Sequence, residues 1–176
     1  MPRRPPPKPL LLPDAGPLIT LAYANQLDLL QRPGWPLRLV DMVLYEVTRN
    51  PTPSRDAIRR FVEAQRVTLI ETQVGRRYQR QLAAQPDQIR RAGLGELAIQ
   101  EAINTLALKS PAQPAVFLFE DHKIARTSFH LPDGTLRVST RAFLLFLEQQ
   151  GHIDSAAEIE HAAITAGRSF SRLRFP

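Results

Sequence analysis

The sequence predicts one α/β domain, folded as a three-layer α/β/α sandwich around a central, mostly parallel sheet. Short apolar runs typical of buried strands alternate along the chain with longer stretches of helical periodicity, which is the order of elements in open parallel sheets. The length of 176 residues suits one compact domain with short ends, and a hydrophobic content of 43% is sufficient for a core.

The first strand and helix are predicted where the proline-rich start of the chain gives way to leucines. Residues 10–12 form an apolar run that ends just before Asp14. Pro17 then opens a helix, because proline is tolerated in the first helical turn. Leucines at helical spacing continue as far as Leu30, and the Arg-Pro-Gly segment 32–34 ends the helix.

The rest of the chain repeats this alternation of strand and helix. A second strand lies within residues 37–42, and Asp41 can cap the helix that follows it. Ser54 can cap the next helix, after a break at residues 50–53. The remaining predicted elements are a strand at 67–70, a helical stretch at 75–92 with a break at Pro86, a helix at 94–109, a strand at 115–119, a turn at 132–134, a strand at 136–138, and a helix capped by Ser139 or Thr140 that ends at Gly151.

The net charge of +6 is confined to the two ends of the chain. Residues 1–10 and 166–176 together hold six arginines and lysines and no acid. Removing those six from the total of 23 leaves 17 basic residues against 17 acidic ones. We therefore predict a basic proline-rich arm at 1–9, a folded domain at 10–165 and a basic tail at 166–176. Such ends attract phosphate backbones without reading sequence, or only improve solubility, and charge alone favours neither interpretation.

Composition excludes several classes of protein. The absence of cysteine removes disulfides and thiolate metal sites, and it suits a reducing cytoplasm. No apolar run approaches the length needed to cross a bilayer, so we expect no membrane span. Five prolines among the first nine residues leave no room for the apolar core of a signal peptide. The four histidines lack the spacing of a zinc enzyme.

Two acidic residues directly follow predicted strands. Asp14 comes after the first strand, and Asp121 comes just after the strand at 115–119. Ligands of open parallel sheets gather at the carboxyl ends of the strands, so both carboxylates are candidate site residues. Taken singly, each is more simply explained as a helix cap or a turn residue.

A third candidate, Glu96, lies at the edge of the apolar stripe of the helix at 94–109 and leans toward the core. Glu101 in the same helix points nearly the opposite way, into solvent. An ionised carboxylate beside a buried face needs a partner. That partner is either an arginine, such as Arg91 or Arg126, or a metal ion.

Glu46 raises the same question, because Met42 and Val43 precede it by four and three positions on a helix. The alternative is an exposed glutamate paired with Arg49 or Arg59.

Convergence of the four carboxylates on one point would create strong repulsion. A hard divalent cation such as Mg²⁺, which prefers oxygen ligands, would neutralise them. A metal held in this way lowers the pKa of a bound water and stabilises charge on phosphate oxygens, so such a site suits phosphodiester hydrolysis. The four candidates are Asp14, Glu46, Glu96 and Asp121.

Five segments, in order and in register, resemble the motifs of the PIN domain family. LLLPDAGPLITLAYANQLDLL is similar to its opening strand and helix, and VDMVLYEVTR to its second acidic motif. GLGELAIQEAI resembles the Gly-Glu helix of one branch, that of VapC-like ribonucleases, and VFLFEDHKIAR resembles the fourth motif. STRAFLLFLEQQGHI is similar to the closing pattern of that branch. The resemblance covers nearly all of the predicted domain.

The resemblance implies a PIN-like sandwich whose acidic pocket binds Mg²⁺ or Mn²⁺ and cleaves RNA endonucleolytically, leaving 5′-phosphate and 3′-hydroxyl ends. Toxins of toxin–antitoxin pairs belong to this superfamily, so a cognate antitoxin and a homodimer are implied partners. Thr140 falls where the family often has a hydroxyl, although a simple helix cap explains it equally well. The implied metal ligands are Asp14, Glu96 and Asp121, with Glu46 completing the catalytic set and Thr140, Lys123 and Arg126 contacting the substrate.

The sequence departs from the pattern of that branch at two acidic positions. Gly93 stands where an aspartate is common, and Glu120 replaces an aspartate. The alternative is therefore a catalytically degenerate PIN domain that acts as an RNA- or protein-binding regulatory module. A phosphorylated receiver-type protein is disfavoured, because it would need a lysine where the last strand ends in Val138 and Ser139.

Overall fold

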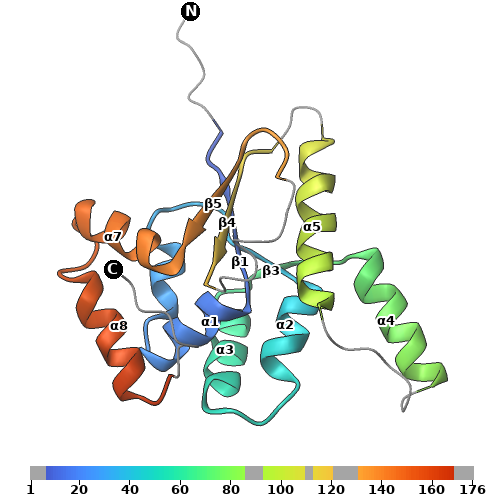
Figure 1. Ribbon diagram of the computed structural model, residues 1–176, viewed down its shortest axis with the longest axis horizontal. Helices are drawn as coiled ribbons and strands as arrows, with labels where there is room; N and C mark the ends of the chain where they lie inside the picture. Colours follow the sequence, from blue (N-terminus) through green and yellow to red (C-terminus); the bar gives the residue numbers. More distant parts are fainter. Residues whose placement is uncertain (1–6, 86–92, 110–112, 121–130, 169–176) are drawn as a thin grey trace, which may run out of the picture.

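A parallel sheet forms the centre of the structure, a computed structural model that describes residues 7–85, 93–109, 113–120 and 131–168 (Figure 1). Its strands are β1 (Leu10–Pro13), β2 (Arg38–Val40), β3 (Thr68–Ile70), β4 (Ala115–Phe119) and β5 (Thr135–Ser139). One sheet has the order β1-β4-β5 and the other pairs β2 with β3, and every pairing is parallel. A parallel bridge between Leu11 and Leu37 joins the two in the order β3-β2-β1-β4-β5.

β1 occupies the middle of this order, and the chain winds away from it in both directions. It first passes through β2 to β3, and then returns to β4 and β5 on the other side. Pro13 is paired with Leu118, and the Asp14 amide donates to the Leu118 carbonyl at 2.8 Å, so β1 and β4 end side by side. A reversal point of this kind is where open parallel sheets bind ligands.

Helices flank the sheet, which confirms the predicted α/β fold with a central parallel sheet. They are α1 (Ala15–Tyr23), the 3₁₀ helix η1 (Leu27–Gln31), α2 (Asp41–Thr48), α3 (Pro53–Ala64), α4 (Gln73–Ala84), α5 (Leu94–Ala107), α7 (Thr140–Gln149) and α8 (Ala156–Thr165). α1, α2 and α3 pack against one another, α5 packs on α2 and β2, and α7 packs on β4 and β5. Figure 1 shows α4 and α5 on one flank, and α7 and α8 on the other.

No helix in these ranges is long and apolar enough to span a bilayer. Residues 86–92 of the predicted arginine-rich stretch lie outside the described residues, and α4 ends at Ala84, before the predicted break at Pro86.

The first helix is shorter than the leucine pattern predicted. α1 ends at Tyr23, and the last leucines of the pattern lie in the separate helix η1. Asn25, between the two, has a φ of 55°, a left-handed conformation that interrupts the helical phase. The three leucines of η1 are nevertheless buried. Leucines at helical spacing therefore do not distinguish one long helix from two short ones.

Two of the predicted helix caps are wrong, and a third is confirmed. Asp41 is the first residue of α2 rather than its cap, and Ser54 lies inside α3, which begins at Pro53. Ser139 caps α7, because its hydroxyl accepts a hydrogen bond from the Ala142 amide at 3.1 Å.

The core fixes the two central strands and with them the residues that follow each strand. Every position of β1 is buried, Leu11 completely, and Phe117 of β4 is also completely buried. Each such side chain contributes about 1.5–3 kcal/mol to folding. α8, which the sequence pattern did not indicate, packs on α1 and α7 and completes this side of the fold.

Candidate active site

Asp14 and Thr140 lie at the carboxyl ends of β1 and β5. Asp14 is only 8% exposed and holds the cap position of α1, yet its side chain makes no capping hydrogen bond. The cap position predicted as its simplest alternative role is therefore confirmed, and only the side-chain hydrogen bond of a cap is missing. Thr140 is buried as the first residue of α7, and its hydroxyl is 3.4 Å from the carbonyl oxygen of Phe119.

The carboxylate at the end of β4, that of Glu120, is neutralised by the protein itself. Both of its oxygens accept from the Thr20 hydroxyl at 2.8 Å, and the Arg168 guanidinium donates to Oε2 at 2.9 Å. Arg168 Nε also donates to the Thr20 oxygen at 3.0 Å. A Cβ at Gly16 would lie 2.7 Å from Cβ of Glu120, so glycine is needed for this approach.

A second acid borders this buried cluster. Burial raises the pKa of Glu160, the charge of Arg141 lowers it, and the charge of Glu120 raises it further, with a net upward shift. No local pattern predicted this cluster, because Arg168 lies 48 positions from Glu120 and belonged by composition to the basic tail.

Glu46 and Glu96 form a second acidic pair, between α2 and α5, in which the charges are not balanced. Burial of its carboxyl group raises the pKa of Glu46, Arg49 lowers it and Glu96 raises it, and the net shift is upward. Much of the Glu46 side chain is exposed, but its Oε2 lies 2.9 Å from where a Cβ of Gly95 would be. Gly95 therefore makes room for a carboxylate that leans toward the start of α5.

No salt bridge joins these two acids to their predicted partners in the described part of the chain, although Arg49 lowers the pKa of Glu46. Neither Glu46 nor Glu96 has a salt bridge there, so Glu46 is exposed as the alternative expected but is not paired directly with Arg49 or Arg59. Glu96 is exposed in the first turn of α5, rather than leaning into the core as predicted. The arginines suggested for it, at positions 91 and 126, lie outside the described residues.

The structure thus describes part of the predicted quartet. Asp121, Lys123 and Arg126 lie outside the described residues. Within the described ranges, no three His, Cys, Asp or Glu side chains form a group that could hold a metal ion. Asp14, Glu46 and Glu96, which are all described, therefore do not form such a group by themselves.

Two further acids, Asp41 and Glu101, have structural roles. Asp41 accepts hydrogen bonds from the Met42 amide at 2.7 Å, the Thr72 amide at 2.8 Å and the Thr72 hydroxyl at 2.9 Å. Glu101 was predicted to point into solvent. Its carboxylate instead accepts hydrogen bonds from the amides of Gln73 at 2.6 Å and Val74 at 3.1 Å, at the start of α4. A carboxylate is favoured there by the helix dipole.

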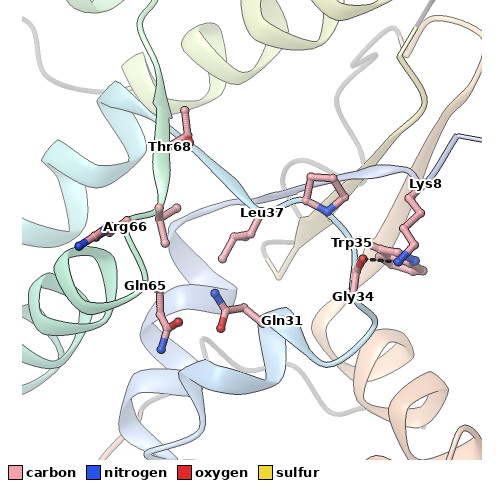
Figure 2. Close-up of a pocket in the computed structure, with 10 residues that line it drawn as sticks. Lys8, Gln31, Gly34, Trp35, Leu37, Gln65, Arg66 and Thr68 are labelled. Atoms are coloured by element: carbon pink, nitrogen blue, oxygen red, sulfur yellow. Dashed lines mark hydrogen bonds between the residues drawn. The ribbon is translucent and has the colours of Figure 1, made fainter.

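Two cavities differ in whether an acid lines them. One of about 470 Å³ opens at the amino ends of β1, β2 and β3, where Lys8 donates to the Gly34 carbonyl at 3.0 Å (Figure 2). It has no acid in its wall and lies at the opposite end of the strands from Asp14. Another, of about 320 Å³, borders Glu46. It is lined by Ile19, Tyr23, Glu46, Val47, Arg49, Asn50, Thr52, Ser54, Gly167 and Arg168.

Comparison with solved structures shows a likeness in fold to one known domain. No protein-family model matches the sequence, and no curated protein matches it. The chain is similar to the PIN domain of T. brucei RRP44, with a TM-score of 0.48 and 16% sequence identity, over 82% of this chain and 84% of that chain. A likeness at this level transfers neither activity nor residue roles, so a function has to be inferred from the residues of this chain.

Proposed function

We propose that this chain is a PIN-type endoribonuclease that hydrolyses RNA phosphodiester bonds in the cytoplasm with the help of Mg²⁺ or Mn²⁺. The observation that carries the proposal is the pair of Glu46 and Glu96. Burial raises the pKa of Glu46, Arg49 lowers it and Glu96 raises it, and the net shift is upward; neither acid has a salt bridge within the described ranges. Neighbouring carboxylates that no salt bridge neutralises are typical of sites that bind a divalent cation.

The donor set fits a hard cation, because carboxylate oxygens are the ligands that Mg²⁺ and Mn²⁺ prefer. We assign Asp14, Glu96 and Asp121 as the residues that would hold the ion, and Glu46 as the base that orients the attacking water. When bound, the ion would lower the pKa of that water and stabilise charge on the phosphate oxygens. Asp14 suits this role because it is buried at the reversal point of the sheet.

Three further residues are assigned to substrate binding. The Thr140 hydroxyl lies beside Phe119, the last residue of β4. Glu120 and Asp121 follow Phe119 directly in the sequence. Lys123 and Arg126 follow Asp121 within five positions, and cations so close to a catalytic acid suit contacts with phosphate.

The decisive test is Asp14→Asn, compared with Asp133→Asn, which makes the same charge change in an exposed turn. We expect wild type and Asp133→Asn to cleave RNA with Mn²⁺, leaving 5′-phosphate ends, and Asp14→Asn to be slower by roughly 100-fold or more. Gel analysis of a labelled RNA measures both rates. Full cleavage by Asp14→Asn would contradict the proposal.

At the level of the cell, we propose that the enzyme is the toxin of a toxin–antitoxin pair. Expression should then arrest growth, Asp14→Asn should not, and co-expression of a neighbouring antitoxin gene should restore growth. Colony counts on inducing plates measure all three. Unimpeded growth with active enzyme in the native host would overturn the toxin role and leave the nuclease role intact. A homodimer is also proposed, and light scattering tests it.

A second function is favoured by the Glu120 cluster. Arg168 and Thr20 already satisfy the carboxylate that stands at the end of β4, and the described acids alone form no metal group. Such a chain could be a degenerate PIN domain that binds RNA or protein without cutting it. RNA binding that persists in EDTA, together with no cleavage in Mn²⁺, would identify this second function.

A further inference from the structure

We propose that the cavity beside Glu46 binds one nucleotide of single-stranded RNA, next to the phosphodiester bond that is cut. The proposal rests on the nuclease function above and adds a site of substrate recognition to it. The ligand is a ribonucleotide whose base enters the cavity and whose phosphate stays at the rim.

The cavity connects the two acidic clusters. It lies between the ends of α1 and α2, the start of α3 and the residues that follow α8. Its volume of about 320 Å³ is within the range of small-ligand sites, roughly 300–1,000 Å³. Glu46 forms part of one wall, and Arg168, which is bonded to Glu120 at 2.9 Å, forms part of another. A ligand in this cavity therefore lies next to Glu46, one of the candidate catalytic acids.

The inner wall suits the flat, apolar faces of a nucleobase. Ile19 and Val47 contribute apolar surface, and Tyr23 contributes an aromatic ring. Gly167 has a φ of 101°, and a Cβ added there would be in van der Waals contact with that ring, 3.9 Å from Cε1. Any larger residue at 167 would be strained and would also narrow the cavity. Stacking on an aromatic ring contributes about 1–3 kcal/mol per base.

Asn50 supplies the group that can distinguish one base from another. It is exposed at the cavity wall just beyond α2, and its side chain makes no hydrogen bond within the described ranges. A carboxamide offers both a donor and an acceptor, which pair with complementary groups on the edge of a base.

The rim of the cavity suits a phosphate. Arg49 is exposed there and forms no salt bridge with a described acid, although it lies near enough to Glu46 to lower its pKa. Arg168 is fixed by its bonds to Glu120 and Thr20. The hydroxyls of Thr52 and Ser54, 3.2 Å apart, add neutral donors.

The shape of the site favours a single strand. A cavity this size holds one base, and a base enters it only when it is unstacked and unpaired. Single-stranded loops and ends of RNA present such bases, whereas bases in a duplex stay stacked and paired.

The test uses mononucleotides in EDTA, so that binding is measured without cleavage. The ¹⁵N-labelled full chain is titrated with 5′-AMP, GMP, CMP and UMP and followed by NMR. We expect shifts at Tyr23, Arg49 and Asn50, and an affinity that differs among the four nucleotides. Because EDTA prevents cleavage, binding is measured independently of catalysis, and Asp133→Asn, in an exposed turn, should bind like wild type; failure of the nuclease proposal and failure of this site therefore remain distinguishable.

Matched variants assign the contacts. Tyr23→Ala should weaken binding about 10-fold, and Tyr23→Phe, which keeps the ring, should not. Asn50→Ala should reduce the preference among the four nucleotides. Arg49→Ala should weaken all four several-fold, whereas Arg59→Ala, which removes an exposed arginine from outside the cavity, should have no effect.

Two results would overturn the proposal. One is the absence of shifts at the cavity residues with all four nucleotides at millimolar concentration. The other is wild-type affinity and preference in both Tyr23→Ala and Asn50→Ala. If Tyr23→Ala fails to fold, Asn50→Ala decides the question, because its exposed side chain has no described structural partner.

Discussion

Two acids on α2 have opposite environments, although they lie on one short helix. Asp41 accepts three hydrogen bonds and ties the ends of β2 and β3 together. Glu46, little more than one turn later, has no described salt bridge, and burial together with the charge of Glu96 outweighs Arg49 and raises its pKa. The first acid stabilises the fold, whereas the second is held where its charge is unfavourable. Perturbed carboxylates of that second kind are enriched at functional sites.

A glycine faces each of these acids. A Cβ at Gly75 would collide with the carboxylate of Asp41, and one at Gly95 would lie 2.9 Å from Glu46 Oε2. The two clashes differ in kind, because Asp41 is locked by its hydrogen bonds and Glu46 ends a flexible, partly exposed side chain. Gly75 is therefore needed for the stability of the fold, whereas Gly95 affects only the position of Glu46 in the candidate site.

The largest effect is expected when a buried acid that has an ion-pair partner, Glu120, loses that partner. In Arg168→Ala, Glu120 loses its cation while remaining buried, and we expect the free energy of unfolding to fall by roughly 3 kcal/mol. Urea denaturation measures the loss. The double variant Glu120→Gln with Arg168→Ala should recover much of it. Equal losses in the single and double variants would show that the ion pair is not responsible.

Gly75→Ala should have the next largest effect. The added methyl group must displace the Asp41 carboxylate and disturb its bonds to Thr72, so we expect a loss of about 2 kcal/mol. Asp41→Ala should destabilise by a similar amount, and the two losses should not add. Thermal melts of the three variants test this, and strict additivity would contradict it.

A pH series sharpens the contrast at Glu46. A raised pKa means that the folded state binds the proton more tightly than the unfolded state, so ionisation of Glu46 lowers stability as pH rises above the ordinary glutamate range. Glu46→Gln should be more stable than wild type at pH 7, by at most about 0.5 kcal/mol after solvent screening. The advantage should vanish below about pH 4, where both states are protonated. An advantage that grows in acid would contradict the assignment.

The smallest change in stability is expected for Gly95→Ala. Alanine improves helix propensity by up to about 1 kcal/mol, which offsets the displacement of Glu46, so unfolding should shift by less than about 0.5 kcal/mol. Cleavage in Mn²⁺ should nevertheless fall about 10-fold, because Glu46 no longer points toward the start of α5. Unchanged cleavage in a folded Gly95→Ala protein would remove Glu46 from the proposed site.

Much of the sheet could be predicted from the sequence because its central strands are short, fully buried apolar runs. The runs before Asp14 and Glu120 show this most clearly, although they did not predict the order of the strands. The leucines after Tyr23 were misleading, since periodicity does not record the left-handed turn at Asn25.

Contacts between elements could not be predicted in the same way. A helical wheel describes one helix in isolation, so it gave no indication that the start of α4 would meet Glu101. The helical wheel also predicted that Glu96 leans toward the core, whereas in the structure Glu96 is exposed. The bond between Arg168 and Glu120 joins residues 48 positions apart, and no local pattern records it.

The position of Arg168 decides where the molecule can be shortened. Judged by composition, the chain becomes a loose basic extension at residue 166, and trimming there would seem harmless. Its guanidinium, however, is the one cation bonded to Glu120 among the described residues. A truncation, an affinity tag or a fusion joint at the carboxyl terminus should therefore leave residues up to 168 in place.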